Sequence, residues 1–173
     1  MVKILFVCLG NICRSPTAEG VFRHLLESRQ WQHRVEVASA GTSGWHIGEA
    51  PDLRAQQEAW RRGIDLSGLR GRAVHGRDFE HYDYLIAMDG ENLDAMQEVC
   101  PEAYLHKLYR FTDFAPELGV SDVPDPYYGG AHGFRDVFDI IEARAQGLLR
   151  EVEADGFQGG RLLAKASVSK RTS

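Results

Sequence analysis

Cysteine is scarce in this chain, and its spacing suits neither a disulfide framework nor a metal site. The 173 residues include three cysteines, an odd number, whereas small disulfide-stapled domains carry paired cysteines. No Cys-x-x-Cys pair or Cys/His cluster has the spacing of zinc ligands. The sequence therefore predicts that Cys8 and Cys13 are reduced thiols that form no zinc site.

Excess positive charge and long apolar runs are also lacking. The formal net charge of −5 argues against broad nucleic-acid binding, because a protein that reads a phosphate backbone normally presents a basic face. The apolar run that ends at Leu9 is too short for the core of a signal peptide or for a membrane span. We therefore expect a cytoplasmic protein that binds neither nucleic acid nor a membrane, and a small anionic substrate would need a local basic pocket.

The apolar content is sufficient for one hydrophobic core. With 43% apolar and 26% charged residues, the chain fits a single compact domain. No internal repeat or linker marks a second domain, so we predict one domain over residues 1–155. Residues 156–173 contain three glycines, four basic residues and no acidic residue, a composition typical of a flexible tail.

Apolar runs and helical stripes alternate along the chain. A near-continuous apolar run after Met1 suits a strand that is buried on both faces of a parallel sheet. Ser15 followed by Pro16 predicts a helix N-cap and a first-turn proline. The predicted strands are 2–7, 35–40, 84–88 and 105–108, and the predicted helices are 15–28, 53–62 and 134–152. This order indicates an α/β fold with a central four-stranded parallel sheet and helices on both faces.

The segment between the first strand and the first helix carries the chemistry. It reads Cys-Leu-Gly-Asn-Ile-Cys-Arg-Ser from Cys8 to Ser15, and parallel sheets bind ligands at this end of their strands. Five residues between Cys8 and Arg14 let backbone N–H groups converge on one anion, and Arg14 can close the ring with its planar fork. The same donors would stabilise a thiolate, so Cys8 is predicted to be a nucleophile.

Two other interpretations fit part of this loop. A buried structural cysteine beside a stabilising arginine also satisfies the Cys8 and Arg14 spacing, but Gly10, Ser15 and the strand-loop-helix placement favour catalysis. A nucleotide-binding loop is not indicated, because no Gly-Lys-Ser/Thr follows and no lysine lies in the loop. A single phosphoryl group is the expected ligand.

Residues 7–16 resemble the signature Val-Cys-x-Gly-Asn-x-Cys-Arg-Ser-Pro of the low-molecular-weight protein tyrosine phosphatase family, without a gap. The likeness extends to residues 39–45, 82–89 and 123–129, and so spans about residues 2–153. Standing alone, Asp125 between two prolines would be read as an ordinary turn residue. The resemblance implies instead that it is the general acid, on a loop that both prolines restrict.

The resemblance further implies a phosphocysteine on Cys8, hydrolysed by water, with Ser15 donating a hydrogen bond to the departing thiolate. This route requires no metal or other cofactor. It implies that the phosphoryl group is bound by Arg14 and by the rest of the loop, namely Leu9, Gly10, Asn11, Ile12, Cys13 and Ser15. It also implies an aromatic rim for the phenyl ring of the substrate, made of Trp45, Tyr127 and Tyr128. The expected substrate is a phosphotyrosine protein or a small aryl phosphate, and a tyrosine kinase is one candidate partner.

Three positions qualify the resemblance. Relatives directed to phosphoarginine carry threonine at the position of Ile12, so isoleucine favours phosphotyrosine. In the family Cys8 and Cys13 can form a protective disulfide, although a small packed residue is an equal interpretation of Cys13. Many relatives have a histidine at the position of Leu69 that braces the loop through Asn11, so this support is expected to be missing or replaced.

Two other functions share these features. A thioredoxin-coupled arsenate reductase would need a cysteine relay, for which only Cys100 is available with Cys8 or Cys13, and an Asp-Pro-Tyr-Tyr segment is unexpected there. A non-catalytic phosphate-binding module is disfavoured by the combination of Cys8, Arg14 and Asp125. The remaining candidates for chemistry, the histidines, form no motif and are expected at the solvated surface. They include His24, His46, His81 and His132.

Overall fold

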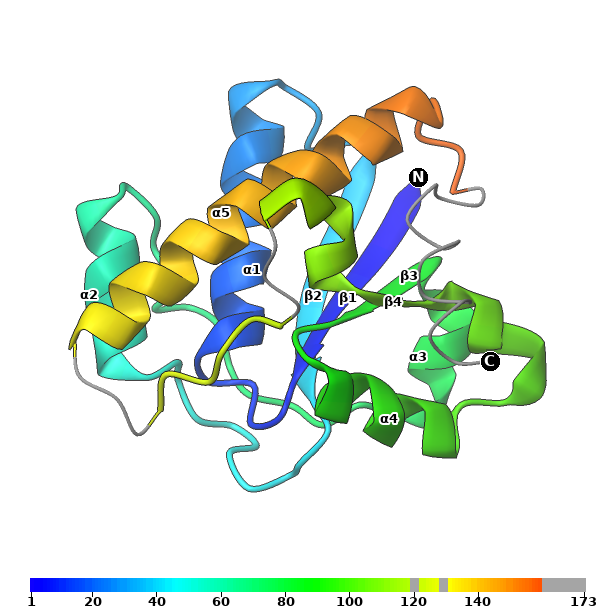
Figure 1. The fold of residues 1–173 in the computed structure, drawn as a ribbon, viewed down its shortest axis with the longest axis horizontal. Coiled ribbons are helices and arrows are strands. Elements are labelled where there is room, and N and C mark those ends of the chain that lie inside the picture. Colours follow the sequence, from blue (N-terminus) through cyan, green and yellow to red (C-terminus); the bar gives the residue numbers. More distant parts are fainter. Residues whose placement is uncertain (119–121, 128–130, 160–173) are drawn as a thin grey trace.

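The computed structural model describes residues 1–118, 122–127 and 131–159. It contains a four-stranded sheet with strand order β2-β1-β3-β4 (Figure 1), and every neighbouring pair is parallel. The strands are β1 (Val2–Cys8), β2 (Val35–Gly41), β3 (Tyr84–Ala87) and β4 (Leu108–Arg110). The α/β fold with a central parallel sheet is therefore confirmed.

Helices cover both faces of the sheet, as predicted. They are α1 (Arg14–Ser28), α2 (Leu53–Arg61), α3 (Gly76–His81), α4 (Gly90–Val99) and α5 (Ala131–Ala154). Figure 1 shows α1, α2 and α5 on one side and α3 and α4 on the other. Along β1, Ile4 and Phe6 join the core cluster with α1 and α5, whereas Leu5 and Val7 join the cluster with α3 and α4. This alternation explains why β1 is apolar throughout.

Helices α3 and α4 were not predicted from the sequence, and two element boundaries also differ from the expectation in a way that the structure explains. The stretch predicted as a strand at 105–108 is mostly a 3-10 helix, Glu102–Lys107, and the strand begins only at Leu108. Leu105 is exposed while Leu108 and Tyr109 are fully buried, so the strand starts where the chain enters the core. The first helix begins at Arg14 with Cys13 at its N-cap, because the Ser15 hydroxyl is engaged with the loop instead of with the helix end.

The close packing of β1 against β2 positions the loop that follows β1. Cys8 pairs with Gly41 at the carboxyl ends of the two strands. A Cβ atom at Gly41 would lie 2.8 Å from the Leu9 carbonyl oxygen, which is shorter than any ordinary contact of this kind. Glycine at this position therefore lets the start of the loop lie directly against β2.

At the end of the described chain, Phe157 packs edge-on against Trp31 with ring centroids 5.1 Å apart. Most of the predicted tail, 160–173, lies outside the described residues, so its flexibility and the domain limit at 155 stay predictions. Within the ranges that the structure describes, no helix has both the length and the apolar character needed to cross a membrane.

Candidate active site

The Cys8 sulfur lies at the carboxyl end of β1, where the following loop folds back over it. Its Sγ atom accepts a hydrogen bond from the Asn11 backbone N–H at 3.2 Å and lies 3.0 Å from the Ser15 hydroxyl oxygen. The Cys8 residue is almost completely buried. When the sulfur is a thiolate, the Ser15 hydroxyl must be the donor, so two donors converge on one negative sulfur.

Asn11 holds this loop in shape. Its side-chain amide donates to the hydroxyls of Ser15 and Ser39, at 2.8 and 3.0 Å. Its carbonyl oxygen accepts the Arg72 backbone N–H at 3.0 Å. The support that was in doubt at Leu69 is thus supplied by the Arg72 main chain, while the Leu69 side chain packs against the core.

Asn11 also has φ +57°, a left-handed conformation that asparagine tolerates better than alanine. We expect Asn11→Ala to lower the free energy of unfolding by roughly 2–3 kcal/mol, from the lost hydrogen bonds and the strained backbone. Urea denaturation measures this change. Asn11→Gly is the matched control. Glycine adopts the positive φ without strain but also lacks the side-chain hydrogen bonds, so this variant should be less destabilised than Asn11→Ala. Wild-type stability in both variants would contradict the bracing role.

Arg14 is buried in the first turn of α1 and is held by two acceptors. Its Nη1 atom donates to Asp89 Oδ2 at 2.5 Å and to the Val123 carbonyl at 3.0 Å. Burial disfavours the charge, but Cys8, Asp89 and Asp125 together outweigh it and raise the pKa of Arg14. The guanidinium is therefore a permanent positive charge in a fixed orientation.

Asp89 was not identified from the sequence as a functional residue. It lies two residues after the end of β3 and forms the N-cap of α4, where its other carboxylate oxygen accepts the Asn92 N–H at 2.7 Å. An aspartate just after a buried strand, at the edge of the sheet where Cys8 lies, was the available signal. Its partner Arg14 is distant in sequence, so the pairing could not be read from spacing.

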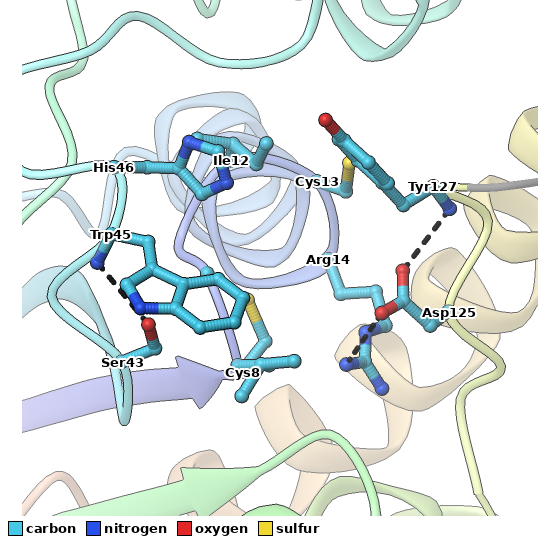
Figure 2. Close-up of a pocket in the computed structure, with 11 residues that line it drawn as sticks. Cys8, Ile12, Cys13, Arg14, Ser43, Trp45, His46, Asp125 and Tyr127 are labelled. Atoms are coloured by element: carbon cyan, nitrogen blue, oxygen red, sulfur yellow. Dashed lines mark hydrogen bonds and ion pairs between the residues drawn. The ribbon is translucent and has the colours of Figure 1, made fainter.

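Asp125 reaches the same site from a loop that is anchored beside β3. The Val123 N–H donates to the Met88 carbonyl at 2.9 Å, and Val123 is fully buried. Two residues later the Asp125 carboxylate lies 3.6 Å from Arg14 Nη2, with its side chain 41% exposed. Its Oδ1 atom accepts the Tyr127 N–H at 3.1 Å. Figure 2 shows this carboxylate turned toward the Arg14 guanidinium.

Between these groups lies a pocket of about 210 Å³. Its wall combines the sulfur, the guanidinium and the carboxylate with several apolar and aromatic side chains (Figure 2). The lining residues are Cys8, Leu9, Gly10, Ile12, Cys13, Arg14, Ser43, Trp45, His46, Asp125 and Tyr127. The predicted residues Asn11 and Ser15 support the loop through hydrogen bonds, and the predicted Tyr128 lies outside the described residues.

One pocket residue, His46, differs in position from the expectation. His46 was expected at the solvated surface, but it lines the pocket with its ring nitrogen 2.8 Å from Glu49 Oε2. Its position next to Trp45 on the rim segment was the only signal in the sequence. Trp45 itself is 84% exposed, so its ring stands at the mouth of the pocket, available to a substrate.

Cys13 differs chemically from Cys8 although both line the pocket. Burial raises the pKa of the Cys13 thiol far above its ordinary value, and the nearby charges of Asp52 and Cys8 raise it further. Cys13 therefore stays a neutral thiol. Across the described ranges, no group of three or more His, Cys, Asp or Glu side chains could hold a metal ion.

Residues 3–158 match the family model described as low molecular weight phosphotyrosine protein phosphatase. The chain belongs to this family. The Bacillus subtilis low molecular weight protein-tyrosine-phosphatase YfkJ is 37% identical over 90% of this chain and 98% of its own length.

Solved structures agree with this assignment. A protein tyrosine phosphatase from Entamoeba histolytica superposes with a TM-score of 0.87 at 38% identity, over 90% of this chain and 99% of its own. The Drosophila arginine phosphatase DARP superposes with a TM-score of 0.81 at 31% identity, over 86% and 96%. The chain is therefore a protein-tyrosine phosphatase, a hydrolase, and the arsenate reductase alternative is not supported.

Proposed function

We propose that this phosphatase hydrolyses phosphotyrosine through a phosphocysteine on Cys8, with Arg14 binding the phosphoryl group and Asp125 as general acid. One observation carries the assignment. The Cys8 sulfur, with the Asn11 N–H and the Ser15 hydroxyl beside it, lies at the end of a pocket where Asp125 lies 3.6 Å from Arg14. A nucleophile, a positive clamp and a proton donor thus share one pocket of about 210 Å³.

In the first step the Cys8 thiolate attacks phosphorus while the bond to the phenolic oxygen breaks. The electron pair of that bond goes to the phenolic oxygen, which takes a proton from Asp125. Arg14 and the loop N–H groups neutralise the charge on the non-bridging oxygens as it redistributes. The ion pair with Asp89 holds the Arg14 guanidinium in place during this step.

In the second step a water oxygen attacks phosphorus and the phosphorus–sulfur bond breaks. The Asp125 carboxylate takes a proton from this water, and the electron pair of the broken bond returns to Cys8. The Ser15 hydroxyl, 3.0 Å from the sulfur, stabilises the thiolate as it leaves. The Asn11 amide orients that hydroxyl because it donates to the Ser15 oxygen.

The pocket shape supports a preference for phosphotyrosine. Trp45 and Tyr127 can flank a phenyl ring, and a short phosphoserine would not extend from the loop to this rim. Because DARP is named an arginine phosphatase, phosphoarginine is the alternative substrate. The apolar Ile12 side chain in the pocket wall favours the aryl ester over the polar guanidino group.

The test compares phosphotyrosine, phosphoserine and phosphoarginine in peptides with identical flanking residues. We expect kcat/KM for phosphotyrosine to exceed that for each other peptide by roughly 100-fold or more, the scale on which pockets discriminate when key groups mismatch. Ile12→Thr should lower the ratio of kcat/KM for phosphotyrosine to kcat/KM for phosphoarginine. A wild-type enzyme that prefers phosphoarginine would overturn the assignment of substrate.

The proposal also covers the cellular compartment and the protein substrate. The cytosol keeps thiols such as Cys8 reduced, which supports a cytoplasmic location. A tyrosine kinase that carries its own phosphotyrosine is a candidate substrate of matching chemistry. Cell fractionation followed by capture of tyrosine-phosphorylated proteins on Cys8→Ser protein would test both points.

A further inference from the structure

The start of α2 joins the two loops that make the site. The Asp52 backbone N–H donates to the Ile12 carbonyl at 2.8 Å, in the loop from Cys8 to Ser15, which we call the phosphate loop. Two residues later, Arg54 Nη2 donates to the Tyr127 carbonyl, also at 2.8 Å. Tyr127 belongs to the loop of residues 123–127 that carries Asp125, which we call the acid loop. One short segment therefore touches both the loop that holds the nucleophile and the loop that holds the acid.

The Arg54 guanidinium is fixed in place at this junction. The Asp52 carboxylate accepts from Arg54 Nε at 3.1 Å and from Nη2 at 2.9 Å, and it also caps α2 through the Arg54 N–H. The Arg54 Cζ atom lies 4.6 Å from the centre of the Phe134 ring and 5.9 Å from the centre of the Tyr127 ring. A planar guanidinium that donates two hydrogen bonds to one carboxylate and lies near two aromatic rings has little freedom to move.

A short chain of contacts leads from Arg54 to the proposed general acid. Arg54 binds the carbonyl of Tyr127, and the N–H of the same residue donates to Asp125 Oδ1 at 3.1 Å. The Asp125 carboxylate is partly exposed and lies 3.6 Å from Arg14. Its direction therefore depends on where the Tyr127 backbone is held.

We propose that Arg54 is a positioning residue for the general acid: it fixes the Tyr127 backbone so that the Asp125 carboxyl points at the leaving oxygen. The inference rests on the proposed function of Asp125. Loss of Arg54 leaves the backbone bond between Asp52 and Ile12, so the phosphate loop and Cys8 keep their support. The defect should therefore fall on proton transfer and spare the nucleophile.

Leaving-group dependence separates these two effects. An aryl ester with a poor leaving group needs the proton from Asp125, whereas dinitrophenolate departs without it. We expect Arg54→Met to lower kcat/KM roughly tenfold for phenyl phosphate, a fraction of the 10²–10⁴-fold that general acids supply, and to change dinitrophenyl phosphate little. The logarithm of kcat/KM should thus fall more steeply with leaving-group pKa than in the wild type.

The experiment measures this slope in wild type, Arg54→Met, Asp125→Asn and the double variant. The double variant should be no slower than Asp125→Asn alone, because a positioned acid that is absent cannot be mispositioned. Arg61→Met is the matched control. Arg61 lies on the same helix and pairs with Glu58 at 3.0 Å, away from the pocket, so the wild-type slope is expected.

The outcomes distinguish this inference from the proposed function. An unchanged slope in Asp125→Asn would show that Asp125 is not the acid, and the proposed function would fail with it. A steeper slope in Asp125→Asn, together with an equal loss for all esters in Arg54→Met, would overturn the positioning role alone. If circular dichroism shows that Arg54→Met does not fold, Arg54→Gln takes its place and the same slopes decide.

Discussion

Cys8→Ser is expected to lower kcat/KM for p-nitrophenyl phosphate at least about 10⁴-fold, the scale of loss when a covalent nucleophile is removed. A serine hydroxyl is almost entirely protonated at neutral pH, even with the Asn11 N–H and the Ser15 hydroxyl beside it. The fold should persist because the side chain is nearly isosteric. Steady-state kinetics measures the loss, and inorganic phosphate should still bind to the intact loop.

Cys100→Ser provides the matched control for this substitution. Cys100 follows α4 and does not line the pocket, so wild-type activity is expected there. Activity of Cys8→Ser within about tenfold of the wild type would be incompatible with covalent catalysis by this sulfur.

Arg14→Lys is expected to lower kcat/KM by roughly 10³-fold, at the upper end of the loss for one transition-state donor. Lysine keeps the charge but cannot form the planar fork that binds Asp89 and the Val123 carbonyl while facing the phosphoryl group. The same variant should bind inorganic phosphate more weakly. Kinetics with an aryl phosphate and competition by inorganic phosphate measure both effects.

Arg23→Lys is the corresponding control. Arg23 lies half exposed on α1, where it pairs with Glu19 at 2.6 Å, outside the pocket. Its replacement should leave kcat/KM unchanged. A loss below about tenfold in Arg14→Lys would mean that a point charge suffices and that the guanidinium geometry has no catalytic part.

Local patterns predicted the fold well where burial dominates. The apolar run of β1 could be read directly because both of its faces are buried, and the last helix because its apolar stripe packs on one face. The fourth strand was misplaced because Leu105 continues an apolar pattern without entering the core. Propensity alone does not say where a chain enters the interior.

The candidate site divides in the same way. The loop from Cys8 to Ser15 is continuous in sequence, so its anion-binding shape follows from spacing. Asp89 and Arg54 act through partners that lie far away along the chain, 75 residues for Arg14 with Asp89 and 73 for Arg54 with Tyr127. Such pairings depend on the sheet order and on the path of the acid loop, which spacing does not contain.

The claim that Cys8 carries the phosphoryl group is tested most directly by rapid mixing with p-nitrophenyl phosphate, acid quenching and mass spectrometry of the peptides. Covalent catalysis by Cys8 predicts a burst of nitrophenol about equal to the enzyme concentration, together with one phosphoryl group on the peptide that contains Cys8. Cys8→Ser should show neither signal. A phosphoryl group on another peptide, or turnover with no phosphorylated enzyme and no burst, would contradict it.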